Sequence, residues 1–126
     1  MEALNFISDQ MSVLGINYEF NEWTSEPIPK TYFVGDEYRE DETTTEDGAK
    51  TSSLIVVGFN RGKSIDLYEA KEKIEKHFDT IDGLSATTDS GCINVSFADS
   101  FNIPTGEADL TKIQFTLKIK EWKGAI

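Results

Sequence analysis

The chain has 126 residues and carries 12 lysines and arginines against 23 aspartates and glutamates, a formal net charge of −11. Its 38% hydrophobic and 28% charged residues are typical of a soluble globular protein, and its length predicts a single domain over residues 1–126. An acidic surface repels nucleic-acid phosphates, and the sequence contains neither a secretory leader pattern nor a run of about 20 apolar residues. We therefore expect no tight DNA binding, no membrane association and no export.

A single cysteine, Cys92, and a single histidine, His77, restrict the possible chemistry. One cysteine cannot form an internal disulfide, and together the two residues cannot complete an intramolecular zinc site. This composition is typical of a reducing cytosol or of an assembly made there. We interpret Cys92 as a small packed thiol and His77 as a structural side chain near a helix end, and we expect no catalytic residue, cofactor or metal.

The N-terminal half of the chain is predicted to contain one helix and three strands. Apolar residues at i, i+3, i+7 and i+10 predict a helix over residues 2–14. Alternation of apolar and polar residues predicts a strand over about residues 16–23, and two prolines then make a bend before a second strand begins near Lys30. A third strand, over about residues 51–60, has four consecutive apolar residues at its centre, so we expect it to be central and covered on both faces.

The most acidic stretch of the chain joins the second and third predicted strands. Residues 36–47 hold seven acidic side chains and one arginine, a net charge of −6. Self-repulsion and the lack of apolar residues beyond Tyr38 keep this stretch out of the core, and Gly48 closes it as a turn. We predict an acidic loop or a projecting hairpin tip over residues 36–48. The candidate interaction residues in it are Asp36, Glu37, Arg39, Glu40, Asp41 and Glu42.

The C-terminal half is predicted to contain one helix and three strands. An apolar stripe predicts a helix over roughly residues 65–78, with Ser64 or Asp66 as its N-cap. Two alternating segments around a turn predict a hairpin over residues 84–97, and the alternation over residues 112–120 predicts the last strand. The element order α-β-β-β-α-β-β-β, with short turns between strands, predicts an α+β fold in which two helices pack on a mainly antiparallel sheet.

Two possible ligand sites are tested by their spacing and rejected. The segment from Gly58 to Ser64 lies between a strand and a helix, where a phosphate-binding loop would lie, but its first glycine comes one position late and Val57 occupies the required place. The acidic stretch lacks the spacing of a calcium-binding loop, so we interpret it as a solvated surface. The sequence therefore does not predict an enzyme.

Charge is distributed unevenly along the chain. Residues 110–126 carry four lysines and one glutamate, a net charge of +3, against the −6 of residues 36–47. Opposite charges on different surfaces of one protomer would suit a head-to-tail contact, which closes into a ring when the rotation allows. Separate solvated faces are the alternative. Lys118 and Lys120 are accordingly further candidate interaction residues.

Five segments distributed over nearly the whole chain carry a resemblance to a known family. They are Tyr18-Glu19-Phe20 with Trp23, the stretch from Tyr32 to Tyr38, Gly58-Phe59-Asn60-Arg61-Gly62 before the second helix, Ile103-Pro104-Thr105-Gly106, and Lys118-Ile119-Lys120-Glu121-Trp122. In this order they resemble the small tail-completion or tail-terminator proteins, which are head-tail joining, minor capsid-like proteins of long-tailed phages and prophages of Gram-positive bacteria. None of these segments is a catalytic motif.

The resemblance implies a structural role for a tail-terminator-like α+β subunit. Proteins of that family assemble, typically as hexamers, into a ring that caps the tail tube and joins it to the head connector. The implied partners are further copies of the chain, a tail-tube protein and the connector, while DNA would pass a negative lumen without specific binding. The implied location is the tail or neck of a virion that is assembled in the host cytoplasm.

A different class of protein is also compatible with the residues. The chain could be a small acidic protein-binding or inhibitory module whose negative face blocks a basic partner. Ring formation at high concentration would favour the tail protein, whereas tight one-to-one capture of a basic protein would favour the inhibitory module.

Overall fold

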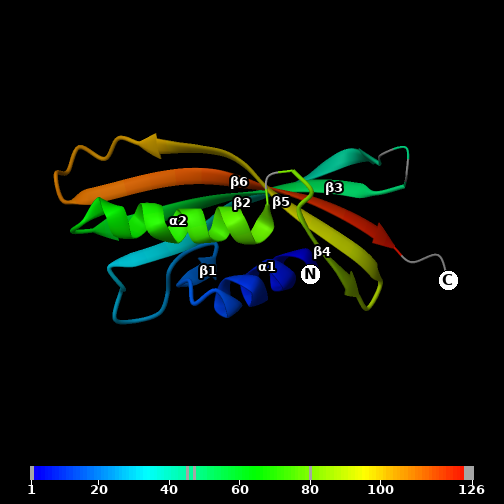
Figure 1. Ribbon diagram of the computed structural model, residues 1–126, viewed down its shortest axis with the longest axis horizontal. Helices are drawn as coiled ribbons and strands as arrows, with labels where there is room; N and C mark the ends of the chain where they lie inside the picture. Colours follow the sequence, from blue (N-terminus) through cyan, green and yellow to red (C-terminus); the bar gives the residue numbers. More distant parts are fainter. Residues whose placement is uncertain (1, 45, 47, 80, 124–126) are drawn as a thin grey trace.

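The computed structural model describes residues 2–44, 46, 48–79 and 81–123, except for the side chains of residues 42–44. The described residues form two helices and six strands in the predicted order, which confirms the α+β class (Figure 1). In chain order the elements are α1 (Glu2–Val13), β1 (Tyr18–Phe20), β2 (Thr31–Thr44), β3 (Lys50–Arg61), α2 (Ser64–Phe78), β4 (Leu84–Thr88), β5 (Gly91–Ile103) and β6 (Leu110–Lys123).

All six strands belong to one sheet in the order β1-β2-β3-β6-β5-β4. β3 and β6 form its centre and stay in register from the pair Lys50 and Glu121 to the pair Arg61 and Leu110. Every neighbouring pair is antiparallel except β1 with β2, so the prediction of a mainly antiparallel sheet is confirmed. The parallel pair was not predicted, and it arises because the connection over residues 21–30 returns the chain to the same end of the sheet.

Both helices pack on the same face of the sheet, and in Figure 1 they lie in front of it. The predicted stripe of α2 is confirmed, because Leu67, Ile74 and Phe78 are fully buried. Together with the buried residues of α1 they form one core with the inward side chains of the strands, listed in part as Ala3, Ile7, Met11, Leu54, Val56, Phe115 and Leu117. The predicted central position of β3 is confirmed, but its coverage on both faces is confirmed only in part: on the face opposite the helices Val57 is buried, whereas Ile55 is partly exposed.

The start of α2 differs from the predicted caps. The N-cap is Lys63, without a side-chain capping bond, so neither Ser64 nor Asp66 has that role. The buried Asn60 stabilises the turn instead: its Nδ2 donates to the Lys63 carbonyl at 2.7 Å, and its Oδ1 accepts from the Thr31 hydroxyl at 2.5 Å. Because β3 runs to Arg61, the segment from Gly58 to Ser64 that resembles a phosphate-binding loop begins inside this strand.

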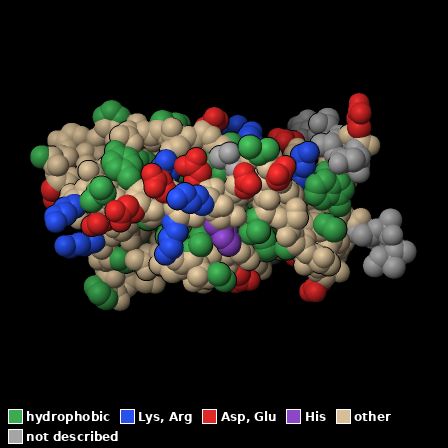
Figure 2. Space-filling view, in the orientation of Figure 1, with side chains coloured by type: hydrophobic (Ala, Val, Ile, Leu, Met, Phe, Trp, Pro, Cys, Tyr) green, Lys and Arg blue, Asp and Glu red, His purple; other side chains and the backbone are tan. Residues whose placement is uncertain are grey.

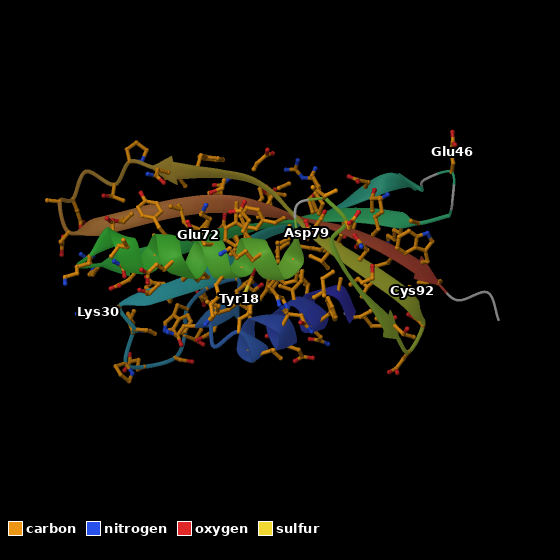
Figure 3. All side chains as sticks on the ribbon, viewed as in Figure 1. Tyr18, Lys30, Glu46, Glu72, Asp79 and Cys92 are labelled. Carbon is orange, nitrogen blue, oxygen red and sulfur yellow. The ribbon has the colours of Figure 1, made fainter. Side chains whose placement is uncertain are left out.

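Most of the acidic stretch lies on a strand and not in a loop. β2 continues to Thr44 and pairs with β3 up to Lys50, so that the two strands form a long hairpin. This hairpin extends past both helices at one end of the molecule, and Glu46 lies at its tip (Figures 1 and 3). Residues 45 and 47 of the predicted acidic stretch lie outside the described part of the chain.

A glycine at the centre of β3 allows the helix layer to approach the sheet. Gly58 pairs with Phe33 of β2, and a Cβ atom at Gly58 would lie 2.5 Å from the Phe33 ring and 3.0 Å from Cδ1 of Leu67. The Phe33 ring in turn meets Phe115 edge-on, with centroids 6.0 Å apart. The close packing of β2, β3 and α2 therefore depends on the missing side chain at this position.

We predict that Gly58→Ala lowers the free energy of unfolding by about 1–3 kcal/mol, because the added methyl overpacks a filled core. Urea denaturation followed by tryptophan fluorescence measures the difference. Ser53→Ala, on the opposite face of the same strand, is the control and should change the stability by less than about 0.5 kcal/mol. Equal stabilities of Gly58→Ala and the wild-type protein would contradict the packing argument.

Candidate interaction surface

The sheet face opposite the helices, which we call the outer face, carries five of the eight candidate interaction residues, namely Glu37, Arg39, Asp41, Lys118 and Lys120. Figure 2 views the molecule from the helix side, where acidic and basic side chains alternate over α2. The strand registers assign the outer-face residues on the four long strands. They are Tyr32, Val34, Glu37, Arg39 and Asp41 on β2, Thr51, Ser53, Ile55, Val57 and Phe59 on β3, Lys112, Gln114, Thr116, Lys118 and Lys120 on β6, and Asn94, Ser96, Ala98, Phe101 and Ile103 on β5.

The half of the outer face near the hairpin tip is polar and of mixed charge. Nη2 of Arg39 donates to Oε1 of Glu37 at 2.7 Å, so the single arginine of the acidic stretch is paired within its own strand. Asp41 accepts a hydrogen bond from the hydroxyl of Thr51 on β3 at 2.5 Å. These contacts fix two of the predicted acidic residues on the sheet surface.

The other acidic candidates are placed differently. Asp36 is exposed at the register shift between Gly35 and Glu37, and Glu40 lies on the helix side of β2, where it forms an ion pair with Lys50. The hydrogen bond and the charge of Glu40 raise the pKa of Lys50 above its ordinary value. The side chain of Glu42 lies outside the described part of the chain.

Lys118 and Lys120 are exposed on the same outer face as the acidic strand. Their register partners on β3 are Ser53 and Thr51, so two strand spacings, about 10 Å, separate β6 from β2. The interpretation that the opposite charges lie on different surfaces is therefore wrong. Opposite charges on one face suit a two-fold contact as well as a head-to-tail contact, so charge alone does not favour a ring.

The other half of the outer face carries a row of aromatic side chains. The ring centroids of Trp23 and Tyr32 are 5.2 Å apart, and those of Tyr32 and Phe59 are 5.1 Å apart with the rings stacked. Nζ of Lys112 lies 5.4 Å from the centroid of Phe59, within the range of a cation–π contact. We call these three rings the aromatic row. A hollow of about 330 Å³ beside it is lined by Trp23, Lys112 and the sheet.

A carboxylate holds Trp23 in place over the sheet. Oε1 of Glu19 accepts hydrogen bonds from the Thr24 amide at 3.1 Å and the Thr24 hydroxyl at 2.6 Å, and Oε2 accepts from the Ser25 amide at 3.3 Å. These bonds lower the pKa of Glu19 to about 2. Nε1 of Trp23 donates to the Ser25 carbonyl at 2.6 Å, so the turn that Glu19 fixes also fixes the indole.

Sequence reasoning missed the aromatic row and the turn that supports it. Tyr32 and Phe59 have outward parity on their own strands, but only the register, which pairs these two residues, brings the rings together. Trp23 lies outside every strand, and the sequence contains no signal that places it over Tyr32.

The two residues singled out for their chemistry have modest roles. Nε2 of His77 lies 2.7 Å from Oε1 of Gln10, so this partly buried side chain links α2 to α1. Cys92 is exposed, which corrects its interpretation as a packed thiol.

Among the described residues, no three His, Cys, Asp or Glu side chains are grouped so that they could hold a metal ion. No helix in the described part of the chain has both the length and the apolar character needed to cross a membrane.

Comparison with known proteins gives a match in structure only. No family model and no curated protein matches the sequence. Among solved structures, a chain of the "virion of native gene transfer agent (GTA) particle" matches with a TM-score of 0.63 at 10% sequence identity. The match covers 87% of this chain and 81% of that chain, so the two share a fold over most of their length.

We predict that the position of Trp23 depends on the ionised form of Glu19. Because the pKa of Glu19 is lowered to about 2, the stabilisation of the turn by its carboxylate is complete above pH 4.5, the ordinary pKa of a glutamate. This stabilisation is lost as the pH falls toward 2. In a Trp122→Phe background, Trp23 emission should stay constant down to about pH 3 and then shift. Glu19→Ala should shift the emission to the red at neutral pH.

Glu22→Ala is the matched control, since it removes a carboxylate from the same connection without breaking any of the bonds to Thr24 and Ser25. A transition of the wild-type emission centred near pH 4.5, or equal spectra for the two alanine variants, would count against this role of Glu19.

Proposed function

We propose that the chain is a structural subunit of a phage-like virion, and specifically a tail-terminator or tail-completion protein. In this proposal its copies form a ring, expected to be a hexamer, that caps the tail tube and joins it to the head connector. The observation that carries the proposal is the fold that this chain shares, over 87% of its length, with a chain of a gene transfer agent virion. The segment resemblance to tail-completion proteins supports the same role.

The surface of the subunit supports an assembly role. One sheet face has no described helix over it and exposes part of an aromatic row, which is an arrangement expected of a protein that contacts other subunits. The net charge of −11 would let DNA pass such a ring without being held, since phosphate and protein repel each other. The proposed function requires no chemical step and no cofactor.

The mixed-charge half of the outer face and the hairpin tip are the proposed contacts with other virion proteins. Glu37 and Asp41 lie on the same face as Lys118 and Lys120, with β3 between them, so a partner with charges of both signs could pair with this half. The hairpin extends beyond the helices and would reach toward the lumen or a tail-tube protein. Asp36 and Glu40, with the rest of the acidic stretch, belong to this proposed contact region.

The test is the oligomeric state of the full chain at rising concentration, measured by mass photometry and viewed by negative-stain electron microscopy. We expect closed rings of one stoichiometry, and we expect neither the rings nor the free subunits to retain double-stranded DNA at about 0.15 M salt, where surface charges are screened beyond about 8 Å. The DNA measurement uses a gel shift with a duplex of random sequence.

Two results would contradict the proposal. A chain that stays monomeric at the highest soluble concentration and captures a basic protein one to one would instead indicate the inhibitory module. Tight retention of the duplex by the ring would contradict free passage of DNA.

A further inference from the structure

The sheet has two edges, and each is covered over only part of its length. On one side β1 pairs with β2 only from Phe33 to Gly35, and the register then shifts. β2 continues to Thr44, and along this length it is hydrogen-bonded to β3. Over residues 36–41, where both backbone and side chains are described, the backbone forms no hydrogen bond on the side that points away from β3. This free part of β2 lies toward the hairpin tip.

The opposite edge, formed by β5 and β4, is also covered over only part of its length. β4 pairs with β5 only over residues 91–95, the Phe97 amide donates to the Asp79 carbonyl at 3.0 Å, and the register shifts between Ala98 and Ser100. Beyond that shift, the described backbone of residues 99–103 hydrogen-bonds on the β6 side only. The free part of β5 therefore lies at the other end of the molecule from the free part of β2 (Figure 1).

The two free segments are compatible as strand partners. Three antiparallel steps separate β2 from β5, so the two strands run in opposite directions within one sheet. A second copy whose sheet continues the first would therefore bring them together as an antiparallel pair. Arg39 and Phe101 both point to the outer face, so this pairing would keep the outer faces of the two copies on the same side.

We propose that neighbouring copies of the chain join edge to edge, with residues 36–41 of β2 in one copy paired to residues 99–103 of β5 in the next. In this contact β4 of one copy would follow the new strand pair at one end, and β1 of the next copy would follow it at the other end. The staggered edges would therefore fit together. The contact is head-to-tail, so it can close into a ring, and a closed sheet requires this kind of stagger between strands. This inference rests on the proposed ring and names the surfaces that form it.

Exposure and charge support the same pairing. Phe101 is 52% exposed on the free edge, and an apolar residue on an unpaired strand edge is a natural site for strand addition. Lys112 pairs with Ile103 one strand in from that edge, and its described contact is with the Phe59 ring and not with a carboxylate. In the register that places Arg39 of the neighbouring copy opposite Phe101, Glu37 of that copy would lie opposite Ile103, on the same face as this lysine.

Disulfide cross-linking tests the proposal in the full chain with Cys92→Ser. Within one copy, β2 and β5 are three strand spacings apart, about 14 Å, whereas the Cα atoms of a disulfide are less than about 7 Å apart. A bond between cysteines at Arg39 and Phe101 must therefore join two copies. Since strand addition fixes the face but leaves a register choice, Glu37→Cys and Asp41→Cys are each combined with Phe101→Cys as well.

We expect at least one of the three outer-face pairs to give a ladder of cross-linked species larger than dimers on mild oxidation at ring-forming concentrations. The matched control is Glu40→Cys with Phe101→Cys, whose side chains lie on opposite faces and should not cross-link. Each single-cysteine variant should also remain uncross-linked.

The other outcomes separate this inference from the proposed function. Rings that form without any cross-link in the three pairs would overturn the edge contact and leave the ring function standing. Dimers from the single Arg39→Cys variant would indicate two-fold pairing of β2 with β2 and would also overturn it. A chain that never assembles would contradict both proposals.

Discussion

The long pairing of β3 with β6 positions both helices and all the outer strands of the sheet. Twelve residues of β3 are in register with β6 at the centre of the sheet, and their inward side chains supply the floor of the core. The two described helices, of 12 and 15 residues, both pack on this side. Once they are placed there, the opposite face must be completed by polar side chains, by the aromatic row, or by another molecule.

The same pairing explains the two staggered edges. β2 and β5, with 14 and 13 residues, flank the central pair and are as long as it, but their own neighbours β1 and β4 have only three and five residues. Each outer strand is therefore left with unpaired backbone at one end. Proteins usually protect such edges, because they can pair with other chains. In this protein the free segments begin at register shifts and lie at opposite ends, which suits a repeated contact between copies.

Local patterns were sufficient to predict the elements of the fold. The stripe ending at Phe78 and the alternation around Phe115 each reflect one buried face, and such periodicity is visible in a single sequence. The cap of α2 could not be predicted this way. Its stabilising side chain is Asn60, which lies in the preceding strand and reaches both Thr31 and the Lys63 carbonyl. That contact depends on the register of β2 with β3.

The candidate surface was predicted only in part for the same reason. Counting charges located the acidic stretch and the C-terminal lysines, but only the sheet order puts Lys118 and Asp41 on one face. The four apolar residues at the centre of β3 indicated burial on both faces. The structure buries Val57 on the outer face but leaves Ile55 partly exposed there, on a face without a described helix. A sequence pattern describes the two faces of a strand, but it cannot say what lies over each.

Whether copies of this chain complete one another's sheet can be measured by amide hydrogen exchange, compared between free and assembled protein. In residues 36–41 and 99–103, the amides that point away from β3 and β6 should exchange quickly in the free subunit and become protected together on assembly, while the β3–β6 centre is protected in both states. Assembled particles in which both segments exchange as quickly as in the free subunit would contradict this pairing between copies.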